Sequence, residues 1–119
     1  MAVIAAYESD DLMYGLLCEW LGRAGHIVGG STRTHDRHTP RADLVIVSVS
    51  GPRRAIDMMM HCVRSVHPDT PIVALSSQAR QGLSSNGALA RELGVARIMA
   101  KPLARRELVS AVDDILAKV

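Results

Sequence analysis

The chain has 119 residues, of which 48% are hydrophobic and 22% are charged, and its net charge is +2 at neutral pH. This length is enough for one domain with a substantial core, and the hydrophobic fraction excludes a disordered chain. The small net charge gives no argument for a nucleic-acid or membrane partner, and one tryptophan, two tyrosines and no phenylalanine leave no platform for stacking bases.

The cysteines and the N-terminus predict the compartment. Cys18 and Cys62 lie far apart and form no CxxC motif, which favours reduced thiols. The first residues reach Glu8, Asp10 and Asp11 too early for a signal peptide, and no apolar stretch approaches the roughly 20 residues that a membrane span needs. We therefore expect a soluble, cytoplasmic domain.

The first part of the chain alternates short apolar runs with an amphipathic stretch. Residues 3–6 have the pattern of a buried strand, and residues 26–28 can form a second one. Between them, apolar residues at helical spacing predict a helix that ends at Gly25. These apolar residues are Met13, Leu16, Leu17, Trp20, Leu21 and Ala24. Residues 29–41 contain no large apolar side chain, so we expect a solvated loop there in place of a helix.

The same alternation continues to the end of the chain. Residues 44–47 predict the central buried strand, and residues 71–75 and 95–100 predict two more. Residues 88–93 predict a short helix after a polar stretch over 78–87. Two longer helices are predicted by apolar residues at helical spacing. They are Ile56, Met59, Met60, Val63 and Val66 for the first, and Leu108, Val112, Ile115, Leu116 and Val119 for the second.

Strands that alternate with helices predict a parallel sheet with helices on both faces. Ligands of such sheets bind at the carboxyl ends of the strands. Polar residues stand at those ends in this sequence, at positions 8–11, 48–54, 76–78 and Lys101. We therefore expect any functional site to lie among them.

These strand ends resemble the receiver domain of two-component response regulators. The resemblance rests on the acidic residues that follow the first strand, on Pro52 four residues after Ser48, on the segment 67–73 that leads into Ser76, and on the pair Lys101-Pro102. It covers nearly the whole chain, residues 1–119, as a single domain. It implies a flavodoxin-like three-layer sandwich with a five-stranded parallel sheet in the order 2-1-3-4-5. The helix between the second and third strands is degenerate or absent.

The resemblance also implies a site. In that family, two acidic residues after the first strand and an aspartate of the third strand hold Mg²⁺, and this aspartate accepts a phosphoryl group from a kinase. Matched by position, Glu8 takes the place of the first acid, Ser9 that of the second, and Ser48 that of the phosphoacceptor. Ser76 and Lys101 keep the family's residue types, which bind the phosphoryl oxygens.

The register at the first strand end follows from the number of residues between it and Gly25, where the predicted helix ends. This count favours Glu8 and Ser9 at the two acidic positions over Tyr7 and Glu8. Asp10 lies one residue further on and could act as a displaced acid.

These changes predict a degenerate phosphorylation pocket. Its residues are Glu8, Ser9, Asp10, Ser48, Ser76 and Lys101. Mg²⁺ prefers carboxylate and other oxygen ligands, so we expect weak or lost Mg²⁺ binding and no resident cofactor. A serine hydroxyl needs a neighbouring base to act as a nucleophile, and none follows from the spacing. We expect Lys101 to pair with Glu8 or to form a hydrogen bond with Ser48.

The leading hypothesis is an atypical receiver that is not an enzyme and acts by protein contact without aspartyl phosphorylation. One alternative is a receiver phosphorylated at a non-standard residue, namely Asp10, Asp11 or Ser48. Another is a sensor of small anions that uses the arginines of the polar segments. These arginines are Arg33, Arg37, Arg41, Arg53 and Arg54.

The partner surface is implied by the resemblance as well. Arg97, Ile98 and Met99 belong to the face that receivers commonly use to dimerise or to dock partners, and Ile98 stands where many members carry an aromatic switch residue. Ile98 and Met99 point to opposite sides of the strand, so only one of them can be exposed. We expect a signalling protein, a fused output domain or a second copy as partner, with no direct nucleic-acid contact and no membrane.

Overall fold

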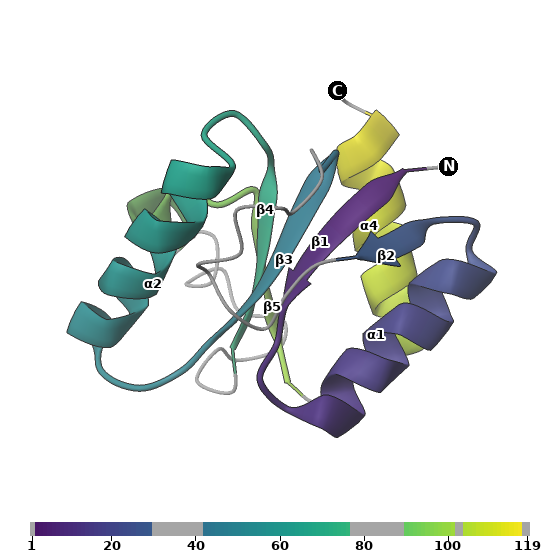
Figure 1. The fold of residues 1–119 in the computed structure, drawn as a ribbon, viewed down its shortest axis with the longest axis horizontal. Coiled ribbons are helices and arrows are strands. Elements are labelled where there is room, and N and C mark those ends of the chain that lie inside the picture. The colour runs from purple at the N-terminus through teal and green to yellow at the C-terminus, as the bar shows by residue number, and fades with distance from the viewer. Residues whose placement is uncertain (1, 30–41, 77–89, 102–103, 118–119) are drawn as a thin grey trace.

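The structure is a computed structural model that describes residues 2–29, 42–76, 90–101 and 104–117. The described strands form one five-stranded parallel sheet in the order β2-β1-β3-β4-β5, flanked by helices (Figure 1). The strands are β1 (Val3–Tyr7), β2 (Ile27–Gly29), β3 (Leu44–Val49), β4 (Ile72–Ser76) and β5 (Arg97–Ala100). The helices are α1 (Asp11–Arg23), α2 (Arg53–Val66) and α4 (Arg105–Ala117), and residues 90–93 are also helical. The predicted fold class and strand order are confirmed.

The helices cover the sheet on both faces, with α1 and α4 on one side and α2 on the other (Figure 1). Successive residues of a strand point to opposite faces, and β3 shows this directly. Leu44 and Ile46 pack in the core shared with α1 and α4, whereas Val45 and Val47 pack in the core shared with α2. Because both faces are covered, all four side chains are buried, which explains the continuous apolar run that predicted this strand.

All five strands differ from their predicted ranges by one or two residues, and the differences are largest at β3 and β5. β3 continues to Val49, so Ser48 lies inside the strand, where it is opposite Leu75 of β4. The last strand begins at Arg97, two residues later than predicted, although the buried Val95 before it belongs to the core. Backbone pairing with β4 thus fixes the strand limits, and the apolar pattern alone could not show them.

Some predictions lie outside the described residues. They include the polar stretch over 78–87 and, with Arg33, Arg37 and Arg41, residues 30–41 of the solvated loop predicted for 29–41. The first residue of that predicted loop, Gly29, instead ends β2. Residues 90–93 are helical and fall within the helix predicted for 88–93, but its predicted start is outside the described range.

Two further observations concern the cysteines and the possibility of a membrane span. Cys18 and Cys62 are free thiols, each half-buried. Among the described helices, none combines the length and the apolar character that crossing a bilayer requires.

Candidate functional site

The candidate site lies at the carboxyl ends of four neighbouring strands. Glu8 follows β1 directly, Ser48 is the penultimate residue of β3, Ser76 ends β4, and Lys101 follows β5. The backbone N–H of Lys101 donates a hydrogen bond to the carbonyl oxygen of Ser76 at 3.0 Å, which extends the pairing of β4 and β5 by one step. The sheet therefore brings these residues to one edge, as the sequence predicted.

Lys101 joins two of the other residues. Its Nζ donates a hydrogen bond to Oε2 of Glu8 at 3.0 Å and another to Oγ of Ser48. The side chain of Glu8 is only 3% exposed and that of Lys101 is 25% exposed, so the ion pair is largely shielded from water. The prediction for Lys101 is confirmed for both of its partners.

The second carboxylate oxygen of Glu8 is also bonded. Oε1 accepts a hydrogen bond from the backbone N–H of Asp10 at 3.0 Å. Glu8 is thus held by Lys101 on one side and by the start of α1 on the other. A buried carboxylate requires such partners, because burial without them is costly.

Asp10, which the sequence suggested as a displaced acid of the pocket, caps the start of α1. Its Oδ1 accepts hydrogen bonds from the backbone N–H groups of Leu12 at 2.9 Å and Met13 at 3.3 Å, which makes Asp10 the N-cap of α1. Asp11 is the first residue of that helix and is exposed, and Ser9 is exposed as well. The Lys101 contacts therefore join Glu8 and Ser48, whereas the carboxylate of Asp10 is occupied at the helix terminus.

The described residues also bear on the question of a metal. Among them, no group of three or more His, Cys, Asp or Glu side chains is placed to hold a metal ion. Glu8 is the one buried acidic residue in the part of the chain that the structure describes. Weak or lost Mg²⁺ binding stays a prediction.

Both apolar side chains of the predicted interaction face are buried, and partner binding at this face stays a prediction. Ile98 is 7% exposed and Met99 is 9% exposed, and they pack in opposite cores. The last strand is an edge of the described sheet, but helices cover both of its faces, so neither apolar side chain is available to a partner. Of the three residues expected there, only Arg97 is partly exposed.

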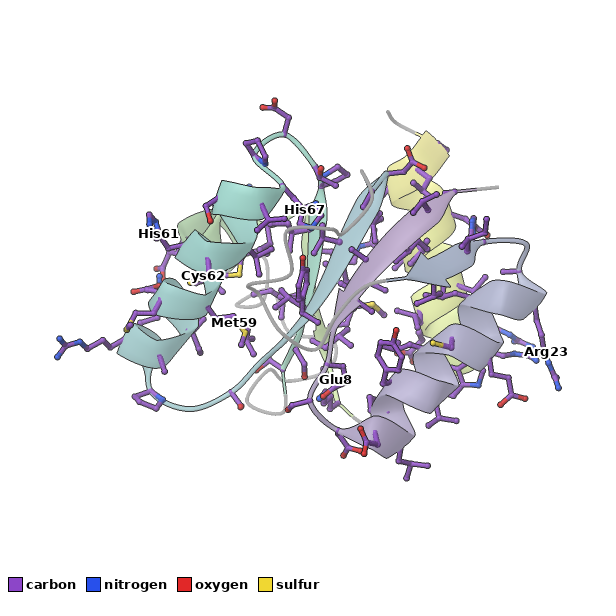
Figure 2. All side chains as sticks on the ribbon, viewed as in Figure 1. Glu8, Arg23, Met59, His61, Cys62 and His67 are labelled. Atoms are coloured by element: carbon purple, nitrogen blue, oxygen red, sulfur yellow. The ribbon has the colours of Figure 1, made fainter. Side chains whose placement is uncertain are left out.

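A buried polar pair on the α2 side of the sheet was not predicted. The hydroxyl of Tyr7 lies 2.8 Å from Nε2 of His67, with the ring centroids 5.9 Å apart in an edge-to-face arrangement. Burial lowers the pKa of His67 below its ordinary value of 6.5. Figure 2 shows His67 at the end of the sheet opposite to Glu8, so the pair is separate from the Lys101 contacts. The two residues are 60 positions apart, and no local spacing signals their contact.

Comparison with known proteins defines the class of the fold. No protein-family model matches the sequence, and no curated protein matches it at a significant level. The structure is similar to chemotaxis protein CheY4 of Vibrio cholerae, with a TM-score of 0.77 and 19% identity over 97% of this chain and 98% of that chain. It is also similar to a response regulator protein of Burkholderia multivorans, with a TM-score of 0.66 and 27% identity over 97% and 95% of the two chains.

A third similar structure is a longer protein. NtrX of Brucella abortus has a TM-score of 0.77 and 16% identity, and the match covers 98% of this chain but 26% of NtrX. Together these likenesses show that the chain has the receiver-domain fold of two-component response regulators. In CheY4 this fold makes up nearly the whole chain, and in NtrX it makes up about a quarter of it.

Proposed function

We propose that this domain is an atypical receiver that signals by protein contact, without phosphorylation of an aspartate. One observation carries the proposal: the ammonium group of Lys101 donates hydrogen bonds to both Glu8 and Ser48. These contacts occupy the position where a receiver would otherwise bind a phosphoryl group. The pocket is closed by the chain's own side chains.

The chemistry of Ser48 supports this proposal. An acyl phosphate forms on a carboxylate, and a serine hydroxyl cannot form one. A serine nucleophile would have to lose its proton to a neighbouring base. The neighbour of Ser48 is the ammonium group of Lys101, which has no lone pair to accept a proton. Ser48 is therefore held as a hydrogen-bond acceptor and is not activated.

The charge balance also supports weak Mg²⁺ binding. The buried carboxylate of Glu8 is already neutralised by Lys101 at 3.0 Å. A divalent cation would have to displace this ammonium group, and the only buried carboxylate among the described residues that it could then bind is that of Glu8. Mg²⁺ sites usually combine one or two carboxylates with waters and substrate phosphates in an octahedron, and a receiver site uses three acidic positions. We infer that the domain works without a metal or another cofactor.

The test is phosphorylation with a small phosphodonor. The protein is incubated with Mg²⁺ and acetyl phosphate, and its intact mass is measured alongside that of a conventional receiver. We expect no phosphoryl adduct on this chain and a full adduct on the conventional receiver. A stoichiometric adduct that is labile to base would overturn the proposal, and peptide mapping would then decide between Asp10 and Asp11. A phosphoserine adduct at Ser48, which hydroxylamine does not cleave, would equally overturn it.

The proposal extends to location and partners. We infer a cytoplasmic, non-enzymatic domain whose partner is a signalling protein, a fused output domain or a second copy of the chain. Light scattering at increasing protein concentration tests the last of these. A molar mass that stays at one chain would exclude the homodimer.

A further inference from the structure

A second candidate site lies between α1 and α4, on the face of the sheet opposite to α2. A cavity of about 430 Å³ is lined by Trp20 and Arg23 of α1 and by Arg105, Arg106, Val109 and Ser110 of α4. This volume is within the range of pockets that hold small molecules. None of these residues takes part in the Lys101 contacts, and Figure 2 shows Arg23 far from Glu8 at the outer end of α1.

The charge of the cavity has one sign. Every charged side chain among its described lining residues is an arginine. Arg23 pairs with Glu19 at 3.0 Å, but both side chains are more than half exposed, so this pair is weak. Within the described part of the chain, neither Arg105 nor Arg106 forms an ion pair. The cavity therefore presents guanidinium groups that an anion can bind in bidentate fashion.

The position of two of these arginines is itself informative. Arg105 and Arg106 are the first two residues of α4. The N-terminus of a helix carries partial positive charge, so cations are disfavoured there and anions are favoured. Both arginines stand at these disfavoured positions beside the cavity, and Glu107 in the same turn offsets part of their charge. A bound anion would relieve the remaining repulsion.

The cavity also has an apolar wall. Trp20 is half-buried, with part of its ring packed against the core beneath α1, and Val109 of α4 is half-buried in the same core. An indole ring is a good surface for stacking a flat aromatic group. The wall and the arginines together suit a ligand that combines an aromatic ring with an anionic group. The hydroxyl of Ser110 adds a further hydrogen-bonding group.

The surface around the cavity does not favour a large protein partner. The exposed large hydrophobic residues of the described chain are Leu12, Ile27, Met58 and Val66, and none of them lines the cavity or belongs to α4. Protein interfaces usually contain buried apolar or aromatic anchors that the partner covers. A small anion of limited area fits this face better.

We propose that the α1–α4 cavity binds a nucleoside phosphate, with the base stacked on Trp20 and the phosphate groups bound by Arg105 and Arg106. This site differs from the anion site suggested by the sequence, which used Arg33, Arg37, Arg41, Arg53 and Arg54. It also shares no residue with the contacts that Lys101 makes to Glu8 and Ser48.

The chain offers a direct reporter of binding, because Trp20 is its single tryptophan. Intrinsic tryptophan fluorescence is measured at low salt during titration with GDP and with CDP, with free tryptophan as the control for light absorption by the ligand. We expect saturable quenching by both nucleotides. Inorganic phosphate at the same concentrations should compete with them but should not quench, because it has no ring to stack.

Matched variants separate the cavity from general attraction of anions. The double variant Arg105→Gln/Arg106→Gln should bind GDP at least tenfold more weakly, and Arg53→Gln/Arg54→Gln on α2 removes the same charge elsewhere and should bind normally. Circular dichroism and thermal melting of both variants establish that they are folded. Equal losses in the two double variants, or no saturable quenching at millimolar GDP, would overturn the proposal. Quenching by an acidic peptide but not by nucleotides would overturn it in favour of a protein partner.

Discussion

Replacing Lys101 with methionine would test whether the Lys101 contacts hold the strand ends together. The change keeps a long side chain but removes the ammonium group, so the carboxylate of Glu8 loses its cation while it remains 3% exposed. Breaking a fully buried ion pair in this way costs about 3–5 kcal/mol. Because the Lys101 side chain is 25% exposed, water can partly replace it, and we expect a loss of about 2–3 kcal/mol in the free energy of unfolding.

Urea denaturation followed by circular dichroism measures this loss. The companion variant Glu8→Gln and the double variant Lys101→Met/Glu8→Gln complete a double-mutant cycle. We expect the double variant to be more stable than Lys101→Met alone, because it contains no unpaired buried charge. Arg23→Met is the matched control, since its exposed pair with Glu19 should contribute no more than about 1 kcal/mol. A loss from Lys101→Met as small as that of the control would refute the reasoning.

Three further predictions follow from the same structure. Ser48→Asp alone should not permit phosphorylation by acetyl phosphate and Mg²⁺, because Ser9 still stands at the second acidic position. A full adduct in the mass spectrum would show that another acid, such as Asp10, completes the site. His67 has a lowered pKa in the folded state because it is buried, so the unfolded state binds more protons, and the free energy of unfolding should fall as the pH is lowered through 6.5. His67→Gln should flatten this part of the stability profile, while His61→Gln, at an exposed position, should leave it in place. Gly94→Ala should destabilise the domain by about 1–2 kcal/mol in urea, since Gly94 has φ +70°, which disfavours any side chain. Gly22→Ala in the last turn of α1, where nothing lies within 4 Å of an added Cβ, should be neutral or stabilising.

The fold could be predicted because its signals are local. Residues 44–47 are apolar without interruption since both faces of β3 are covered, and the helices display their buried stripes at regular spacing. The contacts of Glu8, Ser48 and Lys101 were predictable for a related reason: parallel strands bring their carboxyl ends to one edge. Here the topology alone determines which residues meet.

Other features depend on contacts that no periodicity encodes. Tyr7 and His67 meet because the ring of Tyr7 crosses the sheet face beneath α2, which requires the packing distance between the two layers. The resemblance implied an interaction face at which one of Ile98 and Met99 could be exposed, but both are buried, in opposite cores. The α1–α4 cavity arises from how two helices lie together on the sheet, although α1 ends at Arg23 and α4 begins only at Arg105.

The Lys101 contacts connect strands that are not neighbours in the sheet. Lys101 follows β5 and Glu8 follows β1, and β3 and β4 lie between them. The side chain of Lys101 thus joins the ends of three strands, β5, β1 and β3, through residues up to 93 positions apart. A lysine that binds a phosphoryl group must change partners when the phosphate arrives, and here such a change would leave the buried carboxylate of Glu8 without its cation. The proposed function requires Lys101 to keep its two partners, Glu8 and Ser48, in every signalling state, so that a signal comes from what binds to the surfaces of the domain.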